Sequence, residues 1–286
     1  MDREARLIAV AASDDGTAHG SFFAPRAYEL QSLAQLQREI FGPVLHVIRW
    51  KADQLDAVIE QINATGYGLT LGVHSRIDET IDNIVNRAHV GNIYVNRNIV
   101  GAVVGVQPFG GEGKSGTGPK AGGPLYLKRL QRGAAPLMEH VRQPEAALEA
   151  LIGWLRSNGQ QPVAALAEGY ARTSLNGVSM DLPGPTGESN RLSFTPRGAV
   201  LCAPATSAGL LNQLAAALAT GNRALVLAPA PDAIPANLPV AVKERVRFVG
   251  KEEIDAADVA IALVETGLAG LLRTRLAARP GAIVGI

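Results

Sequence analysis

Short apolar runs rich in β-branched residues alternate with amphipathic helical patterns along this chain of 286 residues. That alternation is typical of the α/β class, in which helices cover a mostly parallel sheet. In the first half, it predicts a helix over 53–65, a strand over 69–73, a helix opened by Ser75 and Asp78 as a capping box, and a strand over 93–95. A glycine-dense loop over 101–123 comes next.

The same alternation returns in the second half. Apolar spacing predicts helices over 145–157, 207–220 and 268–278, and strands over 198–202, 223–227, 259–264 and 282–286. The chain stops on the last of these apolar strands, without a closing cap. We therefore expect the second half to be truncated.

Composition and charge narrow the class of protein. Hydrophobic residues make up 47% of the chain and charged residues 19%, which suits an α/β protein with a folded core. The formal net charge of +1 gives no electrostatic case for binding nucleic acid or an anionic membrane. No apolar run approaches the ~20 residues of a membrane span, and the N-terminus lacks a secretory pattern, so we expect a cytoplasmic protein.

Cysteine and histidine usage excludes several kinds of site. Cys202 is the only cysteine, which rules out disulfides within the chain and cysteine-based metal sites. The histidines never take the spacing of a helical zinc-protease motif, and we predict no metal site. Cys202 lies inside the apolar run GAVLCAP without a basic neighbour, so we predict a buried, inert thiol.

The segment REIFGPVLHV carries the first candidate site. The Glu39 carboxylate can accept hydrogen bonds from a sugar diol, and Phe41 offers a flat face to a ring. Gly42 and Pro43 fix a tight backbone path. On composition alone, however, a solvated charge at a helix end is the commoner role for a residue such as Glu39.

The glycine-rich loop is the second candidate site. Its small side chains and many backbone N–H groups suit the close approach of an anionic group. A flexible connection is the alternative for such a loop. Lys114 and Lys120 offer electrostatic attraction, although lysines in a polar loop are commonly just solvated.

The combination of E-I-F-G-P-V with a later Q-P-F-G-G resembles the C-terminal part of the aldehyde dehydrogenase superfamily. The resemblance implies that residues 1–130 form the C-terminal part of an aldehyde dehydrogenase catalytic domain, with a connector over 131–144. In that family the glutamate of the first motif binds the nicotinamide ribose of NAD, and the phenylalanine packs near the nicotinamide. The resemblance implies these cofactor-binding roles for Glu39 and Phe41.

A narrower resemblance lies in VGAVVGVQPFGGEGKSGTGPKAGG, which is similar to the glutamate γ-semialdehyde dehydrogenase module of the bifunctional proline utilisation A family. In that family, backbone N–H groups of this loop hold the α-carboxylate of the substrate. The resemblance implies that Gly101 and Ala102 bind the carboxylate and that Phe109 packs against the aliphatic stem. Ordinary core packing is the alternative for Phe109.

The resemblance also shows what the chain lacks. The family mechanism needs a nucleophilic cysteine, a glutamate that acts as general base, and an asparagine that stabilises the oxyanion. All three precede the E-x-F-G-P motif in the family order, and no cysteine stands before Glu39 here. We therefore predict no catalytic residue in this chain and an inactive isolated chain.

The second half resembles a degenerate copy of the first cofactor-binding segment of the same superfamily. It keeps the A-A-L-A-x-G-N pattern, with Gly221 and Asn222 at its end. It replaces the family's W-N-F-P by the run Ala205 to Ala208, and the ribose-binding lysine by Ala228. We expect residues 145–286 to form a degenerate Rossmann-like, aldehyde-dehydrogenase-like domain without catalysis, and nucleotide binding there is left open.

These implications converge on part of an NAD-dependent enzyme of proline catabolism that oxidises glutamate γ-semialdehyde (1-pyrroline-5-carboxylate) to glutamate. We expect its partners to be that substrate and the rest of the enzyme or a sister subunit; FAD would belong only to a proline dehydrogenase module outside this chain. One alternative is a non-catalytic lid, scaffold and subunit-contact module. Another is an aldehyde dehydrogenase with a different substrate range.

Overall fold

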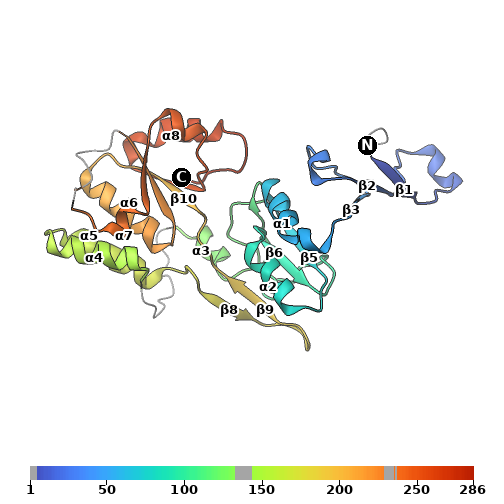
Figure 1. Ribbon diagram of the computed structural model, residues 1–286, viewed down its shortest axis with the longest axis horizontal. Coiled ribbons are helices and arrows are strands. Elements are labelled where there is room, and N and C mark those ends of the chain that lie inside the picture. Colours follow the sequence, from blue (N-terminus) through green and yellow to red (C-terminus); the bar gives the residue numbers. More distant parts are fainter. Residues whose placement is uncertain (1–4, 133–143, 229–234, 236) are drawn as a thin grey trace. The chain divides into compact units, whose positions relative to one another are not determined.

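The computed structural model describes residues 5–132, 144–228, 235 and 237–286 (Figure 1). Contacts within the chain define two compact units, Met1–Tyr67 with Val73–His89, and Gly68–Gly72 with Val90–Ile286. We call them the first and second units and describe each by itself. Parallel strand pairs and helices occur in both, which confirms the predicted α/β class.

The first unit contains a three-stranded sheet and two helices. Strand β1 (Arg6–Val10) runs antiparallel to β2 (Arg26–Leu30), and β2 runs parallel to β3 (Val44–Ile48). The helices are α1 (Leu55–Ala64) and α2 (Asp78–Arg87), and short 3-10 turns span Asp15–His19, Leu33–Gln35 and Ala52–Gln54. Asn63 joins the ends of the two helices, because its amide donates to the Arg87 carbonyl at 2.8 Å and accepts from the His89 N–H at 2.8 Å.

The predicted helix over 53–65 is confirmed, with a 3-10 turn before α1. The predicted capping box is wrong. Helix α2 begins at Asp78 with Ile77 in the cap position and no side-chain cap. The Ser75 hydroxyl accepts from the Ile77 N–H at 3.1 Å, so it closes a local turn just before the helix.

The second unit begins with two short strand pairs. Strand β5 (Thr70–Val73) pairs with β6 (Asn92–Val95), and β4 (Tyr67–Gly68) pairs with β7 (Glu112–Gly113). The predicted strands over 69–73 and 93–95 are thus confirmed. Helix α3 (Tyr126–Leu130) closes this part, and the predicted connector over 131–144 lies almost wholly outside the described residues.

The rest of the second unit is built on a parallel sheet. Its strands are β10 (Ala199–Ala203), β11 (Arg223–Leu227), β12 (Val246–Val249) and β13 (Ile261–Val264), in the spatial order β12–β11–β10–β13. Counted along the chain, that order is 3-2-1-4, the arrangement of a Rossmann-like half. Helix α6 (Ser207–Ala219) connects β10 to β11. The expected Rossmann-like frame of the second half is therefore present.

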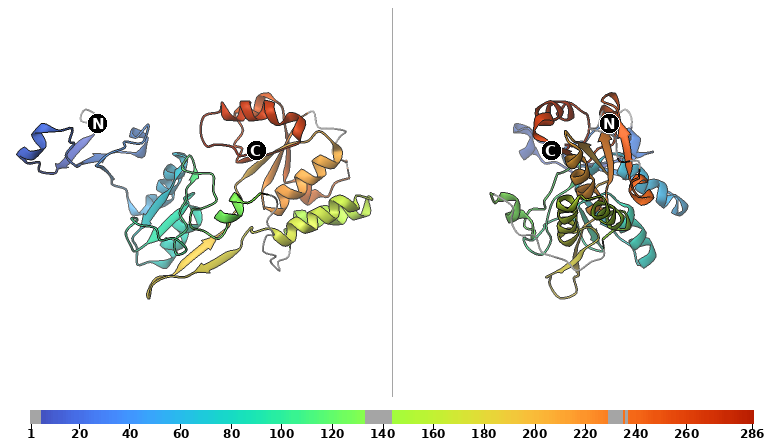
Figure 2. Two further views of the ribbon diagram at one scale, coloured as in Figure 1. Left: turned by 180° about the vertical axis from the view of Figure 1, so that it is seen from behind. Right: turned by 90° about the vertical axis from the view of Figure 1, so that its left-hand side faces the viewer.

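Helices cover both faces of this sheet (Figure 2). One face packs against α6, α4 (Ala146–Ser157), α5 (Gln161–Thr173) and α7 (Val240–Lys243). The other face packs against α8 (Ala269–Ala277) and the 3-10 turn Glu252–Asp255, and a second 3-10 turn, Thr266–Leu268, precedes α8. Alternate residues of β10 separate the two cores, since Val200 and Cys202 join the first and Leu201 and Ala203 the second.

The structure also contains elements that the sequence pattern did not predict. They include the sheet strands β1, β2 and β3 of the first unit and, in the second unit, α3, α5, α7, β12 and the antiparallel hairpin of β8 (Ser179–Leu182) and β9 (Asn190–Ser193). The predicted strand over 282–286 is wrong, because only Gly285 forms a bridge, to Ile261. Pro280 and Gly281 bend the chain, so that one residue rather than a strand meets the edge of β13.

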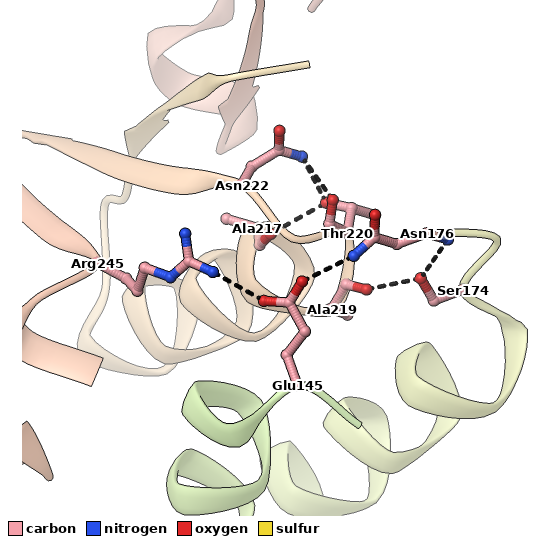
Figure 3. Close-up of polar contacts among 8 residues, drawn as sticks. All are labelled: Glu145, Ser174, Asn176, Ala217, Ala219, Thr220, Asn222 and Arg245. Carbon is pink, nitrogen blue, oxygen red and sulfur yellow. Dashed lines mark hydrogen bonds and ion pairs between the residues drawn. The ribbon is translucent and has the colours of Figure 1, made fainter. Parts of the chain in front are cut away.

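A polar cluster ties the first turn of α4 to the rest of the Rossmann-like part (Figure 3). The Glu145 carboxylate accepts from the Asn176 amide at 2.8 Å and from the Arg245 guanidinium at 3.0 Å. Nearby, the buried Asn222 accepts from the Gly198 N–H at 2.9 Å. The asparagine that ends the A-A-L-A-x-G-N pattern therefore has a structural role here, since it fixes the chain that enters β10.

Among the described residues, no helix is both long enough and apolar enough to cross a membrane.

Candidate functional site

Glu39 and Phe41 lie in the first unit, in the segment that leads into β3. Both side chains are exposed, and Phe41 is 96% accessible to solvent. The backbone beneath them is held in place, because the Pro43 carbonyl accepts from the Arg26 N–H at 3.0 Å and so joins the segment to β2. Within this unit the two side chains are therefore exposed in a segment that is tied to the sheet just after them, at Pro43.

The glycine-rich loop is a folded element of the second unit. Asn92, in β6, donates to the Pro108 carbonyl at 2.8 Å and accepts from the Gly110 N–H at 3.1 Å. Phe109 and Ala121 exchange two backbone hydrogen bonds, of 2.9 and 2.8 Å. These bonds tie the middle of the loop to β6 and to the loop's C-terminal end, so the alternative of a flexible connection does not describe this part of it.

Lys120 is part of this framework. Its ammonium group donates to the carbonyl of Gly110 at 2.6 Å and also to that of Gly91. Partial burial lowers the pKa of Lys120, an effect that the nearby Glu112 carboxylate opposes. The lysine therefore neither sits free in solvent nor offers its charge to a ligand, which corrects both sequence interpretations. Gly91 is required at this point, because a Cβ there would lie 1.9 Å from the Gly110 carbonyl oxygen.

The backbone at Gly101 has an unusual conformation, and the N–H groups around it differ in their hydrogen bonding. Gly101 has a φ of +83°, in the left-handed region that favours glycine. The N–H groups on either side are satisfied, since Val100 donates to the Asn98 side chain at 3.2 Å and Val103 to the Gln107 side chain at 2.9 Å. Within the described part of the chain, the exposed N–H groups of Gly101 and Ala102 find no acceptor.

Phe109 lies in the same loop as Gly101 and Ala102. Its side chain is 36% exposed, which does not fit a residue of the closed core. The structure thus brings these three residues into one element of the second unit. Glu39 and Phe41, the residues expected to bind the cofactor, belong to the first unit. The residues expected to bind the substrate belong to the second unit, so each group is described within its own unit.

Gln107, the first residue of Q-P-F-G-G, was missed as a site residue. It is 8% exposed, although glutamine is ordinarily found at the surface. Its side-chain oxygen accepts from the Val103 N–H, and its backbone N–H donates to the Val103 carbonyl at 2.8 Å. A buried amide beside two exposed N–H groups marks it as the residue that shapes the loop.

Surface hollows do not coincide with these residues. One, of about 460 Å³, lies beside Glu29 in the first unit, and another, of about 500 Å³, lies beside α8 in the second. Neither is lined by Gly101, Ala102 or Phe109. Among the described residues, no group of three or more histidine, cysteine, aspartate or glutamate side chains gathers at metal-binding distance.

Cys202 is buried in the middle of β10, as predicted. Burial raises the pKa of its thiol from 9.0 to about 12, because the thiolate would lose its hydration. Its thiol lies 3.8 Å from the carbonyl oxygen of Val200, to which it can donate a weak hydrogen bond. A thiol in this state is not an activated nucleophile.

A carboxylate of the chain itself lies at the N-terminus of α6. The Glu265 carboxylate, which follows β13, accepts from the Thr206 N–H at 2.9 Å, from the Thr206 hydroxyl at 3.1 Å and from the Ala205 N–H. In Rossmann folds this helix end receives the phosphates of a nucleotide. Here it is occupied by a residue of the chain itself, and a Cβ at Gly209 would lie 2.2 Å from that carboxylate.

Comparisons with known proteins agree with these observations. Residues 2–132 match the aldehyde dehydrogenase family. The chain is 46% identical to the Bifunctional protein PutA of Klebsiella aerogenes over 94% of its own length, and it spans 22% of that protein. It is also 44% identical to a 1-pyrroline-5-carboxylate dehydrogenase of Bacillus pumilus over 44% of this chain and 24% of the relative.

A crystal structure of a Bradyrhizobium japonicum Proline Utilization A (PutA) mutant is 58% identical over 45% of this chain and 13% of that one, with a TM-score of 0.42. The chain thus spans less than a quarter of the curated relatives to which it is similar. Residues 2–132 belong to the aldehyde dehydrogenase family, and the chain is homologous to the C-terminal region of bifunctional PutA proteins and to 1-pyrroline-5-carboxylate dehydrogenases.

Proposed function

We propose that this chain is a segment of an NAD-dependent L-glutamate γ-semialdehyde dehydrogenase, which oxidises the semialdehyde to glutamate. The observation that carries the proposal is the pair of adjacent, exposed and unpaired N–H groups at Gly101 and Ala102. They lie in a family match shared with enzymes named 1-pyrroline-5-carboxylate dehydrogenase. We retain the division into residues 1–130, a connector over 131–144, and 145–286 as part of this proposal.

The substrate-binding role follows from the chemistry of the loop. Two backbone N–H groups can hold a carboxylate without adding a titratable charge of their own. Phe109, half-exposed in the same loop, is suited to pack against the aliphatic stem between the carboxylate and the aldehyde. The loop would thereby fix the far end of the substrate and direct its aldehyde toward the nucleophile.

The cofactor-binding role belongs to the first unit. The Glu39 carboxylate would accept hydrogen bonds from the ribose hydroxyls of NAD, and Phe41 would pack beside the nicotinamide ring. Their exposure in a segment tied to the sheet leaves both side chains available for such a ligand. NAD, when bound, would take up the hydride that the aldehyde carbon loses on oxidation.

The nucleophile and the general base would come from a polypeptide outside this chain, either the rest of the enzyme or a sister subunit. The chain's only cysteine is buried and its thiol has a pKa of about 12. We call the chain together with the polypeptide that supplies the nucleophile the assembled dehydrogenase. FAD would act only in a separate proline dehydrogenase module.

Gly101→Val in the assembled dehydrogenase tests the carboxylate-binding role. The left-handed backbone at Gly101 does not suit a β-branched residue, so the two N–H groups should turn away from the substrate. We expect KM for the semialdehyde to rise about tenfold or more, a loss near 1.4 kcal/mol. Steady-state kinetics with the semialdehyde and with butanal, which has no carboxylate, would measure it.

Gly159→Val is the matched control, because Gly159 also has a positive φ, of +75°, and also has open space around its Cβ position. It should leave both KM values unchanged. Equal kinetics for Gly101→Val and the parent would rule out the carboxylate site. A parent enzyme that prefers butanal would instead favour an aldehyde dehydrogenase of different substrate range.

A non-catalytic lid or scaffold is the second candidate function. It is favoured by the Glu265 carboxylate, which lies at the N-terminus of α6 where a nucleotide phosphate would bind, and by the inert Cys202, which supplies no nucleophile. Deleting residues 145–286 from the assembled dehydrogenase separates the two ideas. A scaffold would be needed for assembly or closure, so its deletion should prevent assembly or lower kcat, although all the proposed ligand-binding residues lie before residue 131.

A further inference from the structure

We propose that Glu188, in the hairpin of the Rossmann-like part, is a positioning residue that holds the substrate-binding loop in shape. This inference rests on the proposed function, and it assigns a second role to the hairpin. The observation behind it is a chain of hydrogen bonds from Glu188 through Gln107 to Val103, next to Gly101 and Ala102.

The hairpin presents Glu188 on a defined turn. Strands β8 and β9 pair in register, with Met180 opposite Leu192. In the connection between them, the Glu188 N–H donates to the Pro185 carbonyl at 3.1 Å, and the Asn190 amide donates to the Pro183 carbonyl at 3.2 Å. The carboxylate is thus carried by a closed turn rather than by a loose loop.

The Glu188 carboxylate has two partners in the segment around the glycine-rich loop. One oxygen accepts from the Arg97 guanidinium at 2.8 Å, and the other accepts from the Gln107 amide. The side chains of Arg97 and Glu188 are only 31% and 24% exposed, so solvent screens this ion pair less than a surface pair. Arg97 also lies over the ring of the buried Tyr94, at 5.3 Å from its centroid.

Glu188 decides how the Gln107 amide is oriented. An amide has one accepting and one donating end, and the carboxylate can only accept. The NH₂ group therefore faces Glu188, and the oxygen faces the Val103 N–H at 2.9 Å. This orientation keeps the Val103 N–H engaged, so the N–H groups of Gly101 and Ala102 remain for the substrate.

Charge balance makes the arrangement compatible with an anionic substrate. A lone carboxylate near the loop would repel the α-carboxylate of the semialdehyde. Arg97 neutralises Glu188 through a direct ion pair. The pair can therefore shape the loop without opposing the substrate.

Glu188→Gln in the assembled dehydrogenase tests the inference. The neutral amide loses the charge pair with Arg97 and no longer fixes the Gln107 side chain. We expect KM for the semialdehyde to rise about three- to tenfold, with kcat changed less than about twofold. KM for NAD and for butanal should stay unchanged, since neither ligand uses the carboxylate-binding N–H groups.

Asp181→Asn is the matched control. It removes the same charge from the same hairpin, but Asp181 is 83% exposed and forms an ion pair with Arg191 of β9, at 3.5 Å, away from the glycine-rich loop. Its kinetic constants should equal those of the parent. A second measurement uses the chain itself: amide hydrogen exchange over residues 101–107 should be faster in Glu188→Gln than in the parent or in Asp181→Asn.

The outcomes separate this inference from the function on which it rests. A raised KM for Gly101→Val with an unchanged KM for Glu188→Gln would overturn the positioning role and leave the proposed function standing. Equal rises of KM for the semialdehyde, butanal and NAD in Glu188→Gln would also overturn it, because a general structural loss would explain them. If Glu188→Gln does not fold, Arg97→Lys, which keeps the charge, should give a smaller semialdehyde-specific rise; no rise would count against the role.

Discussion

At the scale of the residue, burial decides what Cys202 can do. The thiol lies within the parallel sheet, and loss of hydration raises its pKa to about 12. The reactive form is the thiolate, which at pH 8 would make up only about one part in 10⁴ of this group. A buried position also keeps reagents away from the sulfur.

We therefore expect Cys202 to resist alkylation in the folded chain. Iodoacetamide at pH 8 should label no thiol under native conditions and one thiol per chain in denaturant, as measured by mass spectrometry. Ser157→Cys is the control, because Ser157 is exposed at the end of α4 and its cysteine variant should label in the native state. Native labelling of Cys202 at the rate of that control would refute the prediction and reopen its case as a nucleophile.

The residues differ in how far sequence alone could predict them. The burial of Cys202 followed from an apolar run without basic neighbours. The role of Lys120 did not, because its partners are carbonyl groups of Gly91 and Gly110 that only the folded loop brings close. Glu188 and Gln107 are 81 positions apart in the sequence, and no local sequence pattern predicts that their side chains form a hydrogen bond.

At the scale of the element, the N-terminus of α6 is stabilised by a carboxylate from another part of the sheet. The Ala205 N–H is the main reason why the pKa of Glu265 is lowered from its usual value near 4.5, and the Thr206 N–H and hydroxyl add to it. A carboxyl group with a lowered pKa in the folded state stabilises the fold above its unfolded pKa. That stabilisation disappears as the pH falls through the folded pKa.

Glu265→Gln should therefore destabilise the chain at pH 7 but much less near pH 3. We expect a loss of about 0.5–1 kcal/mol at pH 7, reduced from larger helix-end values because the group is partly screened by solvent. Urea unfolding at the two pH values would measure it. Glu244→Gln, at an exposed glutamate, should change the free energy of unfolding by less than about 0.5 kcal/mol. An equal loss at both pH values would contradict the charge-based account.

Periodic elements were the easiest to predict. Helices α4 and α6 carry apolar residues at helical spacing, and strands β10 and β11, which precede and follow α6, are short and apolar, so these elements could be predicted from the sequence. Helix α5 was missed because its buried positions are mostly small alanines, so the segment is less hydrophobic overall than α4 or α6. The hairpin of β8 and β9 was missed because its strands are only four residues long and flank a turn-rich segment, which is too short a stretch for alternation to stand out.

At the scale of the whole molecule, residues 2–132, which match the aldehyde dehydrogenase family, include apolar side chains that are exposed to solvent. Val100 is 78% and Val104 is 83% exposed in the glycine-rich loop, while the core of the Rossmann-like part is closed on both faces of its sheet. Apolar residues grouped at a surface mark a contact site more often than scattered ones do. In the proposed function, the polypeptide that supplies the nucleophile would cover them.

The chain alone should therefore bind a hydrophobic dye such as anilinonaphthalene sulfonate, and should lose that binding in the assembled dehydrogenase. The double variant Val100→Ser and Val104→Ser should lower dye fluorescence of the isolated chain with little change in Tm, because both side chains are already exposed. Leu166→Ser is the control: Leu166 is also exposed, but it stands alone on α5, so its loss should leave the fluorescence nearly unchanged. Dye binding that persists at full strength after assembly would show that the loop faces solvent in the enzyme, and the expected contact with the nucleophile-bearing polypeptide would have to be placed elsewhere.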